Sequence, residues 1–208
     1  FTRALIEVLN TTPSLRRICG FERVSAIPSE STFSRAFAEF AKSKLGERVH
    51  EAMVENSLKT ELIGHISRDS TAIDGREKPV KKAPKEKAKP RKRGRPSKGE
   101  ERKPKEPTRL ERQCDQTAQE ALKELPAFCD VGTKKNSKGY KETWIGYKLH
   151  ADVNDCGLPI SVALTAASLH DSQVAIPLMK MSSAKVQYLY DVMDSAYDAG
   201  PIYEISRS

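Results

Sequence analysis

The stretch TWIGYKLHADVNDCGLPISVALT at residues 143–165 decides the fold class of this chain. Apolar and polar side chains alternate through Thr143–Val153, which is typical of a β-strand, and Leu158–Thr165 predicts a second strand. Between them, Asn154–Gly157 has the composition of a tight turn. We therefore expect these two strands to form a β-hairpin.

Further strands are predicted on both sides of the hairpin. Ile66–Ile73 is a short strand candidate that ends at the turn Asp74-Gly75. A helix is predicted over 171–181, and Val186–Met193 is typical of a buried strand. The order strand, hairpin, helix, strand predicts a mixed α/β fold. It places Asp69 on the first strand and Asp194 at the end of the last, where neighbouring strands could bring them together.

The first 65 residues are predicted to be helical. Thr12-Pro13 and the run Ser29–Thr32 carry N-cap signals ahead of apolar residues at helical spacing, and Glu47–Leu62 is a further amphipathic stretch. A short helix, a tight connection and a capped second helix are the pattern of a helix-turn-helix. An ordinary helical bundle is equally compatible with it. If the segment is a helix-turn-helix, four arginines could reach DNA phosphates: Arg16, Arg17, Arg23 and Arg35.

The positive charge of the chain is concentrated in one segment. The 208 residues carry a formal net charge of +8, but residues 76–112 hold 17 Lys/Arg and 6 Asp/Glu, and six of the twelve prolines. This segment has a net charge of +11, whereas the rest of the chain has a net charge of −3. Because it has almost no aliphatic residues to bury, we expect a disordered insertion that binds polyanions.

Within this insertion, an Arg-Gly-Arg-Pro sequence resembles an AT-hook. Glycine lets an extended backbone lie along the minor groove, and the flanking arginines enter the groove where A·T tracts make it narrow. The residues expected to bind DNA here are Arg91, Lys92, Arg93, Gly94, Arg95 and Pro96. The alternative is a generic basic linker whose lysines and arginines bind phosphates without sequence preference.

The two strand aspartates, Asp69 and Asp194, predict a metal site. Two carboxylates on adjacent strands repel each other unless a cation lies between them. Mg²⁺ or Mn²⁺ binds such a pair and supports phosphodiester displacement. The alternative is that both residues serve as turn-forming aspartates at strand ends.

Several motifs, in the same order along the chain, resemble bacterial insertion-sequence transposases of the DDE type. The segments that carry the resemblance are 14–21, 27–33, 69–71, 144–150, 157–160, 164–172 and 194–198. The resemblance implies an RNase H-like fold and Mg²⁺- or Mn²⁺-dependent strand cleavage and transfer at transposon ends. It makes Asp69 and Asp194 the metal ligands. Lys148 and His150 share one face of their strand and could face DNA phosphate; solvated polar alternation is the other interpretation.

The resemblance and the composition together predict the organisation of the chain. A helical, helix-turn-helix-like domain at 1–65 precedes the first strand of an RNase H-like mixed sheet at 66–75. The disordered AT-hook-like insertion occupies 76–112, and the remainder of the core occupies 113–208. Asp171 is expected to cap a helix and to have no catalytic role.

The third acid of such transposases is a Glu on a later helix, and this chain ends fourteen residues after Asp194. Glu204 is the only Glu beyond Asp194 and comes too early for that role. We therefore expect a C-terminally truncated enzyme that does not cleave or join DNA alone. The alternatives are a non-catalytic DNA-binding protein derived from a transposase and a metal-dependent nuclease of the same fold.

The expected partners are double-stranded DNA and, at full length, further copies of the chain. No stretch approaches the roughly 18 apolar residues that a membrane span needs. The beginning of the chain also has no apolar run typical of a secretion signal. We therefore expect no membrane partner and a bacterial, cytoplasmic, nucleoid-associated protein.

Overall fold

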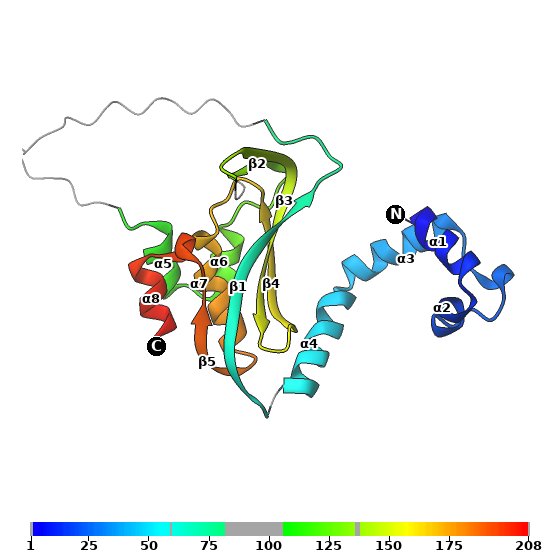
Figure 1. Cartoon of the computed structure of the whole chain (residues 1–208), viewed down its shortest axis with the longest axis horizontal. Coiled ribbons are helices and arrows are strands. Elements are labelled where there is room, and N and C mark those ends of the chain that lie inside the picture. The colour runs from blue at the N-terminus through cyan, green and yellow to red at the C-terminus, as the bar shows by residue number, and fades with distance from the viewer. Residues whose placement is uncertain (1, 59, 82–105, 136–137, 208) are drawn as a thin grey trace, which may run out of the picture. The chain divides into compact units, whose positions relative to one another are not determined.

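The computed structural model describes residues 2–58, 60–81, 106–135 and 138–207 (Figure 1). The chain forms two compact units, which divide between Ser57 and Leu58. Each unit is described by itself. Among the described residues, no helix is both long and apolar enough to cross a membrane.

The N-terminal unit is built from helices. In chain order these are α1 (Thr2–Thr11), α2 (Pro13–Ile18), the 3₁₀ turn η1 (Val24–Ala26), α3 (Glu30–Lys42) and α4 (Leu45–Leu58). The predicted N-cap of α3 is confirmed, because the Ser29 hydroxyl accepts a hydrogen bond from the backbone N–H of Thr32. Pro13 occupies the first position of α2, as its fixed φ favours.

Arg16 has a structural role in this unit. Its guanidinium is buried and donates to the backbone carbonyls of Leu9 at 3.2 Å and Asn10 at 3.3 Å. These carbonyls belong to the last turn of α1, where they have no helical partner. The suggestion that Arg16 reaches DNA phosphate is therefore wrong for this residue.

The second unit contains a mixed sheet. Its strands are β1 (Leu62–Asp74), β2 (Asp130–Lys135), β3 (Lys141–Asn154), β4 (Pro159–Ala166) and β5 (Gln187–Val192). They lie in the order β2-β3-β1-β5, with β4 also paired to β3. β1 is antiparallel to β3 and parallel to β5. The predicted mixed α/β class and the β3–β4 hairpin are confirmed.

The hairpin turn has a local physical cause. The Asn154 side-chain oxygen accepts from the backbone N–H groups of Cys156 at 3.1 Å and Leu158 at 2.8 Å. Gly157 has φ of +79°, a conformation that other residues rarely adopt. The turn sequence therefore fixes where β3 ends and β4 begins.

The helices of this unit gather around α7 (Ser172–Ser183), which packs against β3 and β4 (Figure 1). α5 (Arg109–Asp115), α6 (Ala118–Lys123) and α8 (Gly200–Ser206) all contact α7. Among the described residues, two apolar clusters share α7. One contains Leu125, Ala163, Leu169, Val174 and Leu178; the other contains Ala175, Ile176, Met179, Tyr197 and Ile202.

The structure differs from the sequence-based expectation at several boundaries. β1 begins at Leu62, where a helix was expected to end, because Leu62 and Ile63 pair with β5. α5 begins inside the range expected to be disordered, since Thr108 and Glu111 form a reciprocal capping box. The basic stretch 82–105 lies outside the described residues.

A buried ion pair ties the sheet to the helices. Arg68, on β1, donates through Nε and Nη2 to the two carboxylate oxygens of Asp152, on β3, each at 2.7 Å. Its Nη1 donates to Asp191 on β5 at 3.2 Å. Ser182 of α7 donates to Asp152, and Ser206 of α8 donates to Asp191, both at 2.6 Å. Burial disfavours the charged guanidinium, but the carboxylates outweigh it and raise the pKa of Arg68.

Replacing Arg68 with Met should strongly destabilise the second unit. The substitution leaves Asp152 buried without its cation, a change that typically costs about 3–5 kcal/mol. Urea unfolding followed by circular dichroism measures this loss. Arg112→Met is the matched control, because Arg112 forms an exposed pair with Glu124 and should change the midpoint little. An equal effect of both substitutions would contradict the central role of Arg68.

Candidate active site

The β1–β5 register points to a juxtaposition of the two predicted acids. The last regular pairs are Ile66 with Asp191 and Ser67 with Val192, so continuing this register two residues beyond the end of β5 would place Asp69 beside Asp194. A side-chain contact supports this extension, because Arg68 Nη1 lies 3.2 Å from Met193 Sδ. Successive side chains of a strand point to opposite faces. Arg68 and Met193 meet on the helix-covered face, and Asp69, the next residue of β1, is exposed.

Asp69 and Asp194 are both exposed, and a backbone amide orients each carboxylate. Asp69 Oδ1 accepts from the N–H of Ser70 at 2.7 Å. Asp194 Oδ1 accepts from the N–H of Ala196 at 2.9 Å and thereby caps the 3₁₀ turn η2 (Ser195–Tyr197). These bonds use one oxygen of each side chain. Each carboxylate therefore keeps its other oxygen for a further partner.

This donor set suits a hard divalent cation. Mg²⁺ takes oxygen ligands, commonly one or two carboxylates together with waters and substrate phosphates. The described residues contain no group of three or more His, Cys, Asp and Glu side chains that could hold a metal ion. Metal binding by Asp69 and Asp194 therefore stays a prediction.

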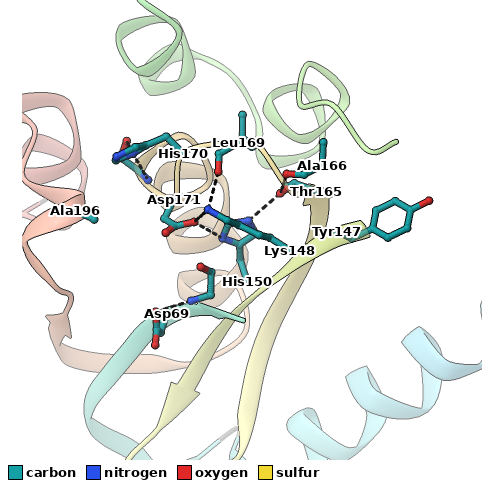
Figure 2. Close-up of polar contacts among 12 residues, drawn as sticks. Asp69, Tyr147, Lys148, His150, Thr165, Ala166, Leu169, His170, Asp171 and Ala196 are labelled. Atoms are coloured by element: carbon teal, nitrogen blue, oxygen red, sulfur yellow. Dashed lines mark hydrogen bonds and ion pairs between the residues drawn. The ribbon is translucent and has the colours of Figure 1, made fainter. Parts of the chain in front are cut away.

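A charged cluster lies at the N-terminal end of α7, as Figure 2 shows. Lys148 Nζ donates to Asp171 Oδ1 at 2.8 Å and to the Leu169 carbonyl at 2.9 Å. His150, two residues further along β3, points to the same carboxylate, with its Nδ1 3.9 Å from Asp171 Oδ1. The prediction that Lys148 and His150 share a face of the strand is therefore confirmed.

The prediction that Asp171 caps α7 is wrong. Its side chain makes no capping hydrogen bond and pairs with Lys148 instead. The side chain of the preceding residue contacts the start of α7 instead. His170 Nδ1 accepts from the backbone N–H of Ser172 at 3.4 Å and lies 2.8 Å from the Ser172 hydroxyl.

His150 is fully buried and neutral at neutral pH. Its Nε2 lies 2.9 Å from the Thr165 hydroxyl, whereas Nδ1 has no hydrogen-bond partner. Burial lowers the pKa of His150 to about 4, and the charge of Lys148 adds to this effect. Asp171 and Asp69 act in the opposite direction without offsetting it. The pKa of His150 therefore depends on the charges of Lys148 and Asp171 and also on that of Asp69.

Tyr197 is a second buried polar residue beside the acids. Its hydroxyl group has no hydrogen-bond partner, and the residue is 3% exposed. Burial raises the pKa of Tyr197, and the charges of Asp171, Asp69 and Asp194 raise it further. Sequence reasoning did not single out this residue. Its position three residues after Asp194, on the turn that Asp194 caps, was the available signal.

The predicted DNA contacts stay predictions. Arg91, Lys92, Arg93, Gly94, Arg95 and Pro96 lie outside the described residues. The Lys148 side chain is only 16% exposed and already has two acceptors within the chain. Contact of Lys148 with a DNA phosphate would require it to leave this pair.

The fold agrees with the comparison with known families. The family model described as Transposase DDE domain matches residues 64–207, more than half of the chain. The chain belongs to this family, whose members act on DNA. Its mixed sheet preceded by helices is consistent with an RNase H-like transposase domain. Comparison with curated proteins and with solved structures gives no match.

The stability of the fold should depend on pH through His150. Its pKa in the folded chain, about 4, lies below the ordinary value of 6.5, so the unfolded chain binds more protons between these values. Stability is therefore lost as the pH falls from 6.5 towards 4, by up to about 3 kcal/mol. The charged groups around the ring are Lys148 on the same strand, Asp171 on α7 and Asp69 on β1.

Urea unfolding between pH 7.5 and 4.5 measures this dependence. His150→Gln retains a side-chain group for Thr165 but does not titrate, so its stability should vary less steeply with pH. His50→Gln, in α4, is the matched control and should keep the steep dependence. Parallel curves for the unmodified chain and His150→Gln would contradict the assignment.

Proposed function

We propose that this chain catalyses divalent-metal-dependent cleavage and transfer of DNA strands at the ends of a bacterial insertion sequence. Asp69 and Asp194 are its metal ligands, and Mg²⁺ or Mn²⁺ is the cofactor. One observation carries the proposal. Two exposed carboxylates would meet if the β1–β5 register continued two residues beyond its last pair, in a chain whose residues 64–207 match the transposase family.

The residues of the chain hold the site in a defined geometry. The amides of Ser70 and Ala196 fix the orientation of the two carboxylates. The Arg68 contacts with Asp191 and Met193 keep β1 and β5 in register beneath them. When bound, the cation activates a water or a 3′-hydroxyl and stabilises the leaving oxygen of the phosphodiester.

The basic segment 76–112 supports DNA as the partner. Its net charge of +11 would supply salt-sensitive affinity for the phosphate backbone. Its Arg93-Gly94-Arg95 core suits a narrow A·T-rich minor groove. The proposal includes a homo-oligomer, because an insertion sequence has two ends to join, and a location at the bacterial nucleoid.

A second candidate function is DNA binding without catalysis, in a protein derived from a transposase. Two observations favour it: the described residues contain no group of three or more His, Cys, Asp and Glu side chains that could hold a metal ion, and the positive charge is concentrated in a segment apart from the acids. Strand-transfer activity and metal binding separate the two functions.

Substituting Asp69→Asn or Asp194→Asn should abolish metal binding and strand transfer. Each change removes one negative ligand, and we expect at least about a 100-fold loss of Mn²⁺ affinity or of strand-transfer rate. Calorimetric titration of the chain with Mn²⁺ measures the first quantity. The strand-transfer rate is measured in an assay with the protein expressed from the reading frame that encodes this chain. Asp115→Asn, an exposed residue at the end of α5, is the control.

Duplex binding should survive both substitutions, because the basic segment remains intact. Activity that persists in Asp69→Asn or Asp194→Asn would show that the metal ligands are assigned wrongly. Mn²⁺ binding without any strand transfer would favour the non-catalytic function.

The AT-hook-like sequence should confer a preference for A·T-rich DNA. At ~150 mM salt, the unmodified chain should bind an A·T-rich duplex more tightly than a G·C-rich one of equal length. The double substitution Arg93→Ala and Arg95→Ala should remove this preference. Lys85→Ala with Lys87→Ala removes the same charge and should weaken binding to both duplexes equally. Fluorescence anisotropy measures the affinity of each of these three proteins for both duplexes; equal affinity of the unmodified chain for both duplexes would exclude the hook.

A further inference from the structure

Two polar side chains, Lys148 and His150, converge on Asp171, and the charge of Asp171 also acts on a third, Tyr197. Lys148 forms a short ion pair with Asp171, at 2.8 Å. The unpartnered Nδ1 of His150 lies 3.9 Å from the same carboxylate oxygen. The buried Tyr197 hydroxyl, also unpartnered, experiences the charge of Asp171 more strongly than that of Asp69 or Asp194.

This cluster connects to both segments that carry the candidate acids. His150 pairs with Ser70 across β1 and β3, and the Ser70 amide donates to Asp69. On the other side, the Tyr197 amide donates to the Asp194 carbonyl at 3.1 Å. Figure 2 shows Lys148 and His150 directed at Asp171, with Asp69 on the neighbouring strand. Residues of the cluster therefore lie on or beside the segments that carry the acids, because His150 pairs with the residue after Asp69 and Tyr197 is three residues after Asp194.

The cluster combines features that packing alone does not require. A buried polar atom without a partner costs about 1–3 kcal/mol, and such atoms in a folded protein call for an explanation. Here one of them, His150 Nδ1, lies 3.9 Å from a carboxylate that is already paired with a lysine. The other is the Tyr197 hydroxyl, whose pKa is raised by burial and by the charge of the same carboxylate. An apolar pair at positions 148 and 171 would avoid the cost of burying two charges.

We propose that the Lys148–Asp171 pair is a positioning element of the active site that sets its affinity for the divalent cation. Asp171 and Lys148 carry opposite charges near two carboxylates that must attract a doubly positive ion. With both present, their charges nearly cancel, and the acids hold the cation at a moderate affinity. The inference rests on the proposed function, because it takes Asp69 and Asp194 as the ligands.

The sign of each substitution follows from charge. Asp171→Asn leaves Lys148 uncompensated beside the acids, so it should lower the affinity for a cation. Lys148→Met leaves Asp171 uncompensated, so it should raise that affinity. Removing both charges should restore an affinity close to that of the unmodified chain. A purely structural role predicts a different pattern, since either single loss would disturb the site and weaken binding.

The test is a calorimetric titration of the whole chain with Mn²⁺ alone. We expect Asp171→Asn to weaken binding by about fivefold to tenfold and Lys148→Met to tighten it by a few-fold. The double variant should lie within about twofold of the unmodified chain. Asp115→Asn and Lys141→Met change the net charge equally at exposed positions away from the cluster and should have little effect. Circular dichroism confirms that each variant is folded.

The outcomes separate this inference from the proposed function. If the unmodified chain binds no Mn²⁺, or if binding survives Asp69→Asn, the metal assignment fails and this inference fails with it. If binding requires Asp69 but both single variants weaken it, the ion pair is merely structural. If a single variant does not fold, Lys148→Arg supplies the second measurement. It retains the charge and should keep the Mn²⁺ affinity, whereas a changed affinity would overturn the proposal.

Discussion

The second unit depends on the buried contact between Arg68 and Asp152. A buried ion pair is costly to form, and it persists only where further hydrogen bonds complete it. Here Asp191, Ser182 and Ser206 do so, and they come from β5, α7 and α8. The pair therefore couples three strands and two helices through one guanidinium. It also fixes the register of β1 against β5, and this register, continued two residues beyond its last pair, would set Asp69 beside Asp194.

The sequence predicts the parts of this fold that have local causes. The β3–β4 hairpin follows from alternation and from a turn in which Asn154 and Gly157 are sufficient. β2 was not predicted, because the segment DVGTKK has no alternating pattern and becomes a strand only by pairing with the first half of β3. The β1–β5 register joins residues more than a hundred positions apart, and no local rule determines it.

The candidate site likewise contains residues that the sequence predicts and contacts that it does not. Asp69 and Asp194 could be named from motifs, since each follows an apolar strand-like run. The pairing of Asp171 with Lys148 could not be predicted from the sequence. Helix capping depends on neighbouring residues, whereas Lys148 comes close to Asp171 only because β3 packs beside α7. The partner of Arg16 also could not be predicted from the sequence. A helical arginine suggests a contact with DNA phosphate, but in the folded chain Arg16 donates to backbone carbonyls at the end of α1.

The charges near the acids explain why a separate basic segment is useful. Arg68 and Lys148, the cations beside Asp69 and Asp194, are both held by carboxylates within the chain. A site that gathers negative charge for a metal repels DNA phosphates until the cation is bound. Attraction for DNA would then come from elsewhere, and residues 76–112, with a net charge of +11, are the segment that we propose supplies it. This segment follows β1 directly, so it would anchor DNA to the same strand that presents Asp69.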